Sequence, residues 1–188
     1  MNKKYNSRRS FIKKTSIIPG IMIIPRHVLG GKGFKAPSDK LNIAGVGVRK
    51  WGMGSGNIDA CSGENIVALC DVDYKQSAPT FKKYPKAKVY KDFRNMFEKQ
   101  KDIDAVIVAT PDHNHAIITM MAIKLGKHVY CQKPLTHTVF EARKITEAAR
   151  EHNVQTQMGN QGRSSDEIRS LKEWINDDAI GPVREIHA

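Results

Sequence analysis

One lysine in this chain stands where proton-transfer chemistry is common. Lys133 follows an apolar run at residues 128–131 and directly precedes Pro134. A proline after a strand ends the hydrogen-bonding ladder and fixes the local backbone, so we expect Lys133 on a rigid turn at a strand tip. Open α/β sheets bind ligands at the carboxyl ends of their strands, and a lysine there can accept and release a proton. The alternative role of Lys133 is a solvated charge at the end of the strand.

Glycines cluster just after the first apolar run of the folded part. Gly45 and Gly47 permit a tight turn in which a pyrophosphate can approach backbone N–H groups at a helix start. The third glycine of the dinucleotide-binding pattern would fall at position 50, which is a lysine. Gly52 and Gly54 follow, so a loop lengthened by about three residues would restore a glycine at the contact between helix and strand. The sequence therefore predicts a phosphate-binding turn that includes Gly45, Gly47 and Gly52.

A single acid ends the second apolar run, residues 66–70. Asp71 lies 26 positions after Gly45, near the offset of ~20 residues at which an acid meets the adenosine ribose. A carboxylate there accepts hydrogen bonds from the ribose hydroxyls and repels a 2′-phosphate. Asp71 therefore predicts NAD rather than NADP as cofactor, and capping of the following helix is its alternative role.

The elements that would position these residues alternate along the chain after residue 40. Continuous apolar runs are typical of strands buried on both faces, and the segments between them have a helical period. We therefore predict an α/β fold, a Rossmann-type doubly wound parallel sheet with right-handed crossovers. A further helix is expected at residues 164–177 and a strand at 182–188. The predicted strands of the sheet are residues 41–46, 66–70, 88–90, 105–109, 128–131 and 154–158.

The formal net charge of +12 raises the question of a nucleic-acid partner. Residues 1–40 carry ten of the 31 basic residues and one of the 19 acidic residues. Residues 41–188 are left with 21 basic and 18 acidic residues, a net charge of +3. Because the excess lies mostly outside the folded part, and no basic stripe is interleaved with aromatic residues, we predict no nucleic-acid partner.

Paired arginines lie near the N-terminus. Residues 7–13, Ser-Arg-Arg-Ser-Phe-Ile-Lys, resemble a twin-arginine export signal. The weakly apolar run after them, about ten residues long, is too short to span a bilayer. We expect residues 1–40 to be an export leader and linker, the twin-arginine export machinery to be a partner, and the protein to be periplasmic or otherwise exported. A disordered basic tail is the alternative.

Cysteines and histidines give no sign of a metal centre. Cys61, Cys70 and Cys131 lie in or beside apolar segments, which predicts buried, reduced thiols. His113 and His115 have no nearby cysteine or paired carboxylate to complete a metal shell. We therefore predict no metal site.

The motifs occur in an order that resembles a known family. The glycine turn, Asp71, the segment Thr110-Pro-Asp-His-Asn-His115 and the segment Cys131-Gln-Lys-Pro134 are together similar to the N-terminal domain of the Gfo/Idh/MocA oxidoreductases, the glucose-fructose oxidoreductase and inositol dehydrogenase family. The resemblance covers residues 41–188. It implies an NAD-binding domain, here residues 41–182, and a C-terminal α+β substrate domain that begins at residues 183–188 and is otherwise absent from this chain.

The resemblance also implies roles for individual residues. Thr110 and Pro111 would line the cofactor near its nicotinamide half, and His115 would pack against it. Lys133 would be the general acid/base. Gln132, which replaces a glutamate usual in the family, is expected beside the cofactor. The alternative role of His115 is to cap the start of a helix as a satisfied polar group.

The resemblance implies hydride transfer between NAD and a hydroxyl-bearing carbon of a sugar or cyclitol. The full-length enzyme is expected to be a homo-oligomer. The same residues would serve a glycosidase that uses bound NAD transiently, around an elimination. If the protein ended at Ala188, it would be a nucleotide-binding module without catalysis. Apolar surface left bare by the missing domain would make this fragment self-associate.

Overall fold

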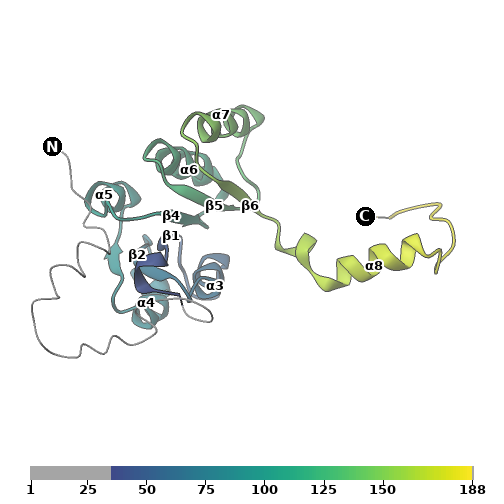
Figure 1. The fold of residues 1–188 in the computed structure, drawn as a ribbon, viewed down its shortest axis with the longest axis horizontal. Coiled ribbons are helices and arrows are strands. Elements are labelled where there is room, and N and C mark those ends of the chain that lie inside the picture. Colours follow the sequence, from purple (N-terminus) through teal and green to yellow (C-terminus); the bar gives the residue numbers. More distant parts are fainter. Residues whose placement is uncertain (1–34, 188) are drawn as a thin grey trace, which may run out of the picture. The chain divides into compact units, whose positions relative to one another are not determined.

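A six-stranded sheet forms the centre of the domain (Figure 1). The computed structural model describes residues 35–187, and the chain from Leu41 onward forms one compact unit. All neighbouring strands run parallel, in the order β3-β2-β1-β4-β5-β6. This is the strand order of a Rossmann-type sheet, so the predicted fold is confirmed. The strands are β1 (Asn42–Val46), β2 (Asn65–Cys70), β3 (Lys88–Tyr90), β4 (Ala105–Val108), β5 (His128–Gln132) and β6 (Thr156–Gly159).

The chain reverses its path across the sheet at β1. Val46 at the end of β1 pairs with Cys70 of β2 on one side and with Val108 of β4 on the other. The connections on the two sides of such a switch point leave in opposite directions. A crevice therefore opens at the carboxyl ends of the strands, where ligands bind in sheets of this kind.

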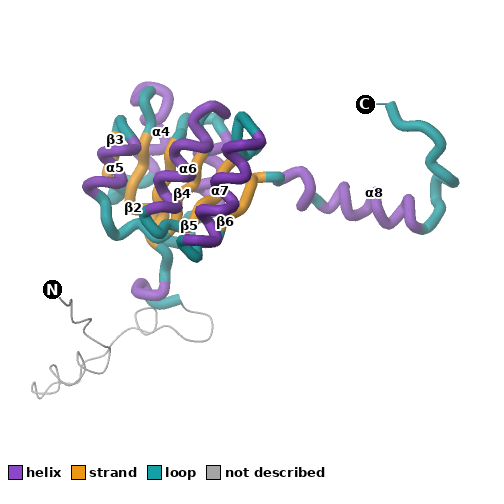
Figure 2. Tube along the Cα trace, turned by 90° about the horizontal axis from the view of Figure 1, so that it is seen from above, coloured by secondary structure: helices purple, strands orange, loops and turns teal. Residues whose placement is uncertain are grey.

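Helices cover both faces of the sheet (Figures 1 and 2). Two separate clusters of buried apolar side chains lie between helices and strands, one on each face. Each fully buried Leu, Ile or Met side chain contributes roughly 1.5–3 kcal/mol to folding. The first face carries α5 (Phe93–Lys99), α6 (His115–Lys124) and α7 (Val139–Glu151), and the second carries α3 (Met53–Ala60) and α4 (Tyr74–Lys83).

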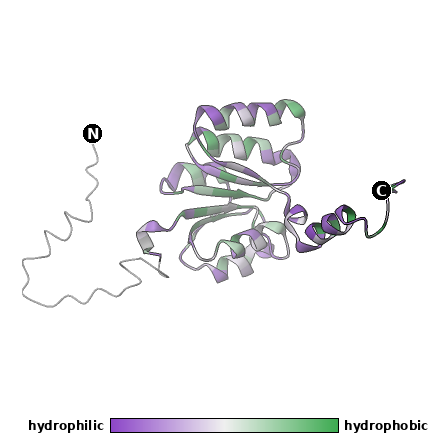
Figure 3. Cartoon of the chain, turned by 45° about the vertical axis from the view of Figure 1, so that its right-hand side comes forward, coloured by the Kyte–Doolittle hydropathy of each residue, from purple (hydrophilic) through white to green (hydrophobic). Residues whose placement is uncertain are grey.

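The last helix, α8 (Asp166–Asn176), follows the short 3-10 helix η3 (Gln161–Ser164) and buries none of its side chains. Ile168, Leu171 and Trp174 recur along α8 at a spacing of three residues, among hydrophilic residues (Figure 3), and each is exposed. The helix predicted at 164–177 is thus confirmed, with an uncovered apolar stripe. That stripe is a surface on which the predicted self-association could act.

Residues after α8 correct one prediction. Residues 182–187 have no regular secondary structure, so the strand predicted there from alternation is wrong for these residues. A strand needs a neighbour to satisfy its backbone N–H and C=O groups. Within the described chain, no strand of the sheet pairs with this segment.

Two further predictions concern the leader and the thiols. The predicted twin-arginine leader at residues 7–13 lies outside the described residues and stays a prediction. None of the described helices is long and apolar enough to cross a membrane. Cys70 and Cys131 are buried free thiols as predicted, whereas Cys61, at the end of α3, is a free thiol that is only partly buried.

A capping box starts α7, directly after the Lys133 turn. The Oγ1 atom of Thr138 accepts a hydrogen bond from the backbone N–H of Glu141 at 3.2 Å, and the Glu141 carboxylate accepts one from the Thr138 N–H at 2.9 Å. Thr138→Ala is expected to lower the free energy of unfolding by about 1 kcal/mol, because the Glu141 N–H loses its partner. Chemical denaturation measures this change.

The matched control for the cap is Thr146→Ala, on the same helix. The Thr146 hydroxyl bonds the Ala142 carbonyl inside the helix, where alanine is at least as favourable as threonine. Equal denaturation midpoints for Thr138→Ala and the wild type would contradict the role of the cap.

Candidate functional site

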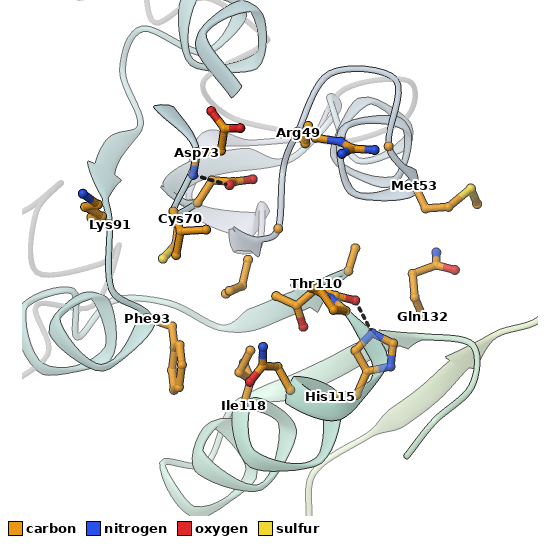
Figure 4. Close-up of a pocket in the computed structure, with 18 of the residues that line it drawn as sticks. Arg49, Met53, Cys70, Asp73, Lys91, Phe93, Thr110, His115, Ile118 and Gln132 are labelled. Atoms are coloured by element: carbon orange, nitrogen blue, oxygen red, sulfur yellow. Dashed lines mark hydrogen bonds between the residues drawn. The ribbon is translucent and has the colours of Figure 1, made fainter. Parts of the chain in front are cut away.

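A cleft of about 630 Å³ lies at the carboxyl ends of the strands (Figure 4). This volume is within the ~300–1,000 Å³ that small-molecule sites occupy. Its walls come from the loop after β1, the ends of β2, β4 and β5, and the start of α6, which are far apart in the sequence. The predicted site residues in its lining are Gly47, Gly52, Asp71, Thr110, Pro111, His115, Gln132 and Lys133.

The turn after β1 allows a very close backbone approach. Gly47 has a φ of +81°, and a Cβ atom there would lie 2.6 Å from the carbonyl oxygen of Ala109. Gly45 lies inside β1 and does not belong to the cleft lining, and a Cβ atom on it would lie 2.7 Å from the side chain of Ile58 on α3. Gly47 therefore forms part of the cleft wall, whereas Gly45 lets α3 pack against the strand.

The lengthened loop brings another glycine to the helix start. Gly52 is the N-cap residue of α3, and a Cβ atom there would lie 3.1 Å from the carbonyl oxygen of Arg49. The closest contact belongs to Gly54, whose Cβ would lie 1.8 Å from the carbonyl oxygen of Gly47. No side chain of the described chain caps α3, so N–H groups of its first turn are available to an anion.

Asp71 ties the end of β2 to the glycine turn. One carboxylate oxygen accepts a hydrogen bond from the Val48 N–H at 2.8 Å, and the other accepts from the Asp73 N–H at 2.9 Å. Asp73, not Asp71, caps α4 by accepting from the Gln76 N–H. The alternative role of Asp71 as a helix cap is therefore wrong. Each carboxylate oxygen has a second lone pair, so Asp71 can also accept from a ligand.

The tips of β4 and β5 carry polar atoms that lack partners. Thr110 Oγ1 and Gln132 Nε2 are buried and make no hydrogen bond within the described residues. The tip of β6 packs on the Gln132 amide, because a Cβ atom on Gly159 would lie 3.1 Å from Gln132 Nε2. Buried polar groups normally have partners, so these two atoms are places where a ligand could bond.

Lys133 lies at the tip of β5, as predicted, and lines the cleft. It is the first residue after β5, its side chain is exposed, and a cis peptide bond joins it to Pro134. It makes no hydrogen bond or ion pair with the residues that the structure describes. Its ammonium group is therefore available to a ligand.

Electrostatics in the cleft differ from wall to wall. Burial raises the pKa of the Cys70 thiol to about 12, with the Asp71 and Asp92 carboxylates adding to the shift, so Cys70 is a neutral, apolar part of the wall.

His115 is 1% exposed and contacts turn carbonyls, so its side chain does not cap α6. Among residues 35–187, no group of three His, Cys, Asp or Glu side chains could hold a metal ion.

Sequence reasoning missed several lining residues. Arg49 belongs to the lengthened loop between the glycines, so its place beside the predicted turn was a usable signal. Lys91 and Phe93 follow β3, where no motif marked the sequence. The other lining residues that were not predicted are Val46, Met53, Cys70, Val72, Asp73, Ala109, Asn114 and Ile118.

Comparison of this sequence with known proteins identifies a matching family and related enzymes. Residues 41–160 match the model of an oxidoreductase family with an NAD-binding Rossmann fold. Inositol 2-dehydrogenase of Salmonella typhimurium is 28% identical over 154 residues, which are 79% of this chain and 44% of the relative. The 1,5-anhydro-D-fructose reductase of Ensifer adhaerens is 39% identical over 90 residues, 46% of this chain and 27% of the relative.

A solved structure shows the same fold. Myo-inositol 2-dehydrogenase from Lactobacillus plantarum superposes with a TM-score of 0.67 at 24% identity, covering 77% of this chain and 43% of that one. The chain thus spans less than half the length of these relatives.

Proposed function

Because the chain belongs to the Gfo/Idh/MocA family of NAD-binding oxidoreductases, we propose that the whole protein is an NAD-dependent dehydrogenase of a sugar or cyclitol, with Lys133 as general acid/base. One observation carries the proposal. Lys133 shares a single cleft with the glycine turn and Asp71, at the switch point of the sheet. Relatives named as inositol dehydrogenases and a sugar reductase support this class of substrate.

The described residues fit a dinucleotide. The turn at Gly47 and Gly54 leaves no room for side chains, which suits close approach of a pyrophosphate to the uncapped start of α3. Arg49 in the same wall supplies a positive charge. Asp71 would accept from ribose hydroxyls at the end of β2. Thr110 Oγ1 and Gln132 Nε2 would find partners on polar groups of the nicotinamide half.

The proposed chemistry assigns one proton to Lys133. Bound in this cleft, NAD would supply the hydride acceptor for the carbon that carries the hydroxyl group, which would become a carbonyl carbon. The neutral amine of Lys133 accepts the hydroxyl proton in the forward direction, and the ammonium returns it in the reverse direction. Lys133 is held in the cleft lining by β5 and Pro134, where a substrate can reach it.

Asp71 provides the test of cofactor binding. We expect NADH to bind more tightly than NADPH, measured by nicotinamide fluorescence. Asp71→Ala should weaken NADH binding at least tenfold, since a charge-assisted hydrogen bond contributes about 1.5–3 kcal/mol. The Val48 N–H also loses its partner in this variant, which would loosen the glycine turn.

Two further variants separate the loss of the cofactor contact from the loosening of the glycine turn. Asp71→Asn keeps an oxygen that can accept from the Val48 N–H but removes the charge and the acceptor of the Asp73 N–H. It should reduce the difference in affinity between NADH and NADPH. Asp166→Ala, which removes an exposed carboxylate on α8, should bind NADH like the wild type. Unchanged NADH affinity in Asp71→Ala would remove Asp71 from the cofactor site.

A further inference from the structure

His115 makes an unusual pair of contacts at the start of α6. The side chain is 1% exposed. Its Nδ1 atom lies 2.7 Å from the carbonyl oxygen of Pro134, and its Nε2 atom lies 2.7 Å from the carbonyl oxygen of Thr110 (Figure 4 draws the second contact). The two carbonyls belong to different turns, one after β5 and one after β4.

The chemistry of the partners determines the protonation of the ring. A backbone carbonyl accepts hydrogen bonds and cannot donate them, and a neutral imidazole has one N–H donor and one lone pair. A neutral ring would therefore place a nitrogen lone pair 2.7 Å from a carbonyl oxygen, whichever tautomer it adopted. Both contacts are hydrogen bonds only if both ring nitrogens carry protons.

We propose that His115 is a buried imidazolium at neutral pH, and that it clamps the Thr110 turn to the Lys133-Pro134 turn so that Lys133 is held at the cleft. His115 is then a positioning residue and not a ligand of the cofactor. The part of this inference that concerns Lys133 rests on the proposed function. The charge of the ring does not, because it follows from the two carbonyl contacts alone.

The groups packed around the ring are compatible with a cation. Burial by itself disfavours the charged form, but the Cys131 thiol and the carbonyls of Pro134 and Thr110 outweigh it and raise the pKa of His115 to about 9. Of the titratable groups nearby, β5 brings Cys131, the turn after it brings Lys133, and the 3-10 helix η2 (Asp112–Asn114) brings Asp112 and His113. Cys131 alone of these acts on the His115 pKa.

This pKa gives the clamp a defined pH window. The value of about 9 lies above the ordinary value of 6.5, so the charged ring binds its proton more tightly in the folded state than in the unfolded chain. Its contribution to stability is fully present below pH 6.5 and is lost as the pH rises through about 9. Loss of a proton leaves one carbonyl without a donor and releases one of the two turns.

Nitrogen NMR of the full chain, labelled with ¹⁵N in histidine, tests the charge without any cofactor. We expect both ring nitrogens of His115 to carry protons at neutral pH and one of them to lose its proton near pH 9. One unprotonated nitrogen at neutral pH would overturn the proposal. Because no ligand is present, that result would leave the proposed NAD-dependent function untouched.

The variant His115→Gln tests the positioning role in the full-length enzyme. Glutamine is neutral and cannot reproduce two donors aimed at two separate turns, so kcat should fall by at least about tenfold. The NADH affinity should fall clearly less than kcat, because the Thr110 turn contributes only part of the cofactor contacts. In addition, the free energy of unfolding of His115→Gln should not show the decline between pH 6.5 and about 9 that we expect of the wild type. Unchanged kcat, or an NADH affinity that falls in parallel with kcat, would overturn the positioning role.

His113→Gln is the matched control. His113 is an exposed neighbour on η2, in contact with the Asn114 amide, and its replacement should change neither kcat nor the pH dependence of stability. An equal effect of both variants would show that the effect is not specific to the clamp. If His115→Gln does not fold, the NMR measurement on the wild-type chain still decides whether the ring is charged.

Discussion

Gly54→Ala is expected to weaken NADH binding at least about a hundredfold while the rest of the chain stays folded. A Cβ atom on this residue would lie 1.8 Å from the carbonyl oxygen of Gly47. Gly47 cannot yield, because its own turn lies against the backbone of Ala109. The start of α3 must therefore move away from the turn. We expect at least two N–H groups of its first turn to lose their hydrogen bonds to the pyrophosphate. At ~1.5 kcal/mol for each charge-assisted bond, the affinity falls at least about a hundredfold.

Gly56→Ala supplies the matched control for this prediction. Gly56 lies two residues further along the same helix, and a Cβ atom there meets nothing within 4 Å. Alanine inside a helix is more favourable than glycine by up to about 1 kcal/mol, so this variant should be slightly more stable and bind NADH normally. NADH titration combined with circular dichroism measures both properties. Wild-type affinity in Gly54→Ala would show that the contact with Gly47 does not shape the cofactor site.

Removal of the Lys133 amine is expected to lower the turnover of the full-length enzyme by about a hundredfold to ten-thousandfold, the usual contribution of a general acid/base. NADH affinity should stay within about twofold of the wild type. The side chain is exposed and has no partner among the described residues, so Lys133→Ala leaves the fold intact. Steady-state kinetics with inositols and sugars, next to NADH titration, separates the two quantities.

Two control variants test whether the effect comes from proton transfer by Lys133. Lys133→Arg keeps the positive charge, but guanidinium does not release a proton in proteins, so this variant should be nearly as inactive as Lys133→Ala. Lys144→Ala removes an exposed amine that pairs with Glu147 on α7 and should leave kcat unchanged. Turnover of Lys133→Ala close to that of the wild type would exclude Lys133 from the proton transfer.

The sheet could be predicted from the sequence because its strands are buried on both faces. Such strands need continuous apolar runs, and the runs near residues 105–109 and 128–131 became β4 and β5 almost residue for residue. The strand predicted at 154–158 begins two residues before β6 and ends one residue before it, because β6 is an edge strand with exposed residues and a weaker pattern. The segment 182–188 alternates like a strand, but alternation cannot supply the neighbouring strand that it needs.

The site was predictable only where local sequence carries its chemistry. Asp71 and Lys133 follow apolar runs directly, so their places at strand tips could be read from the order of residues. The contact of Gly54 with Gly47 depends on how the lengthened loop folds, and the sequence could not rank Gly54 above Gly52. The two carbonyl partners of His115 come from separate turns, which only the tertiary structure brings together.

The cleft takes its walls from both halves of the sheet, and this determines when it exists during folding. β1, β2 and β3 can pair as soon as residues up to 90 are available. The wall with Gln132 and Lys133 forms only after β4 has paired with β1 and β5 with β4. A ligand that binds the complete cleft stabilises the finished sheet and gives no help to a half-assembled one. Cofactor loading therefore follows the pairing of β4 and β5, and it cannot act as a template for these earlier steps.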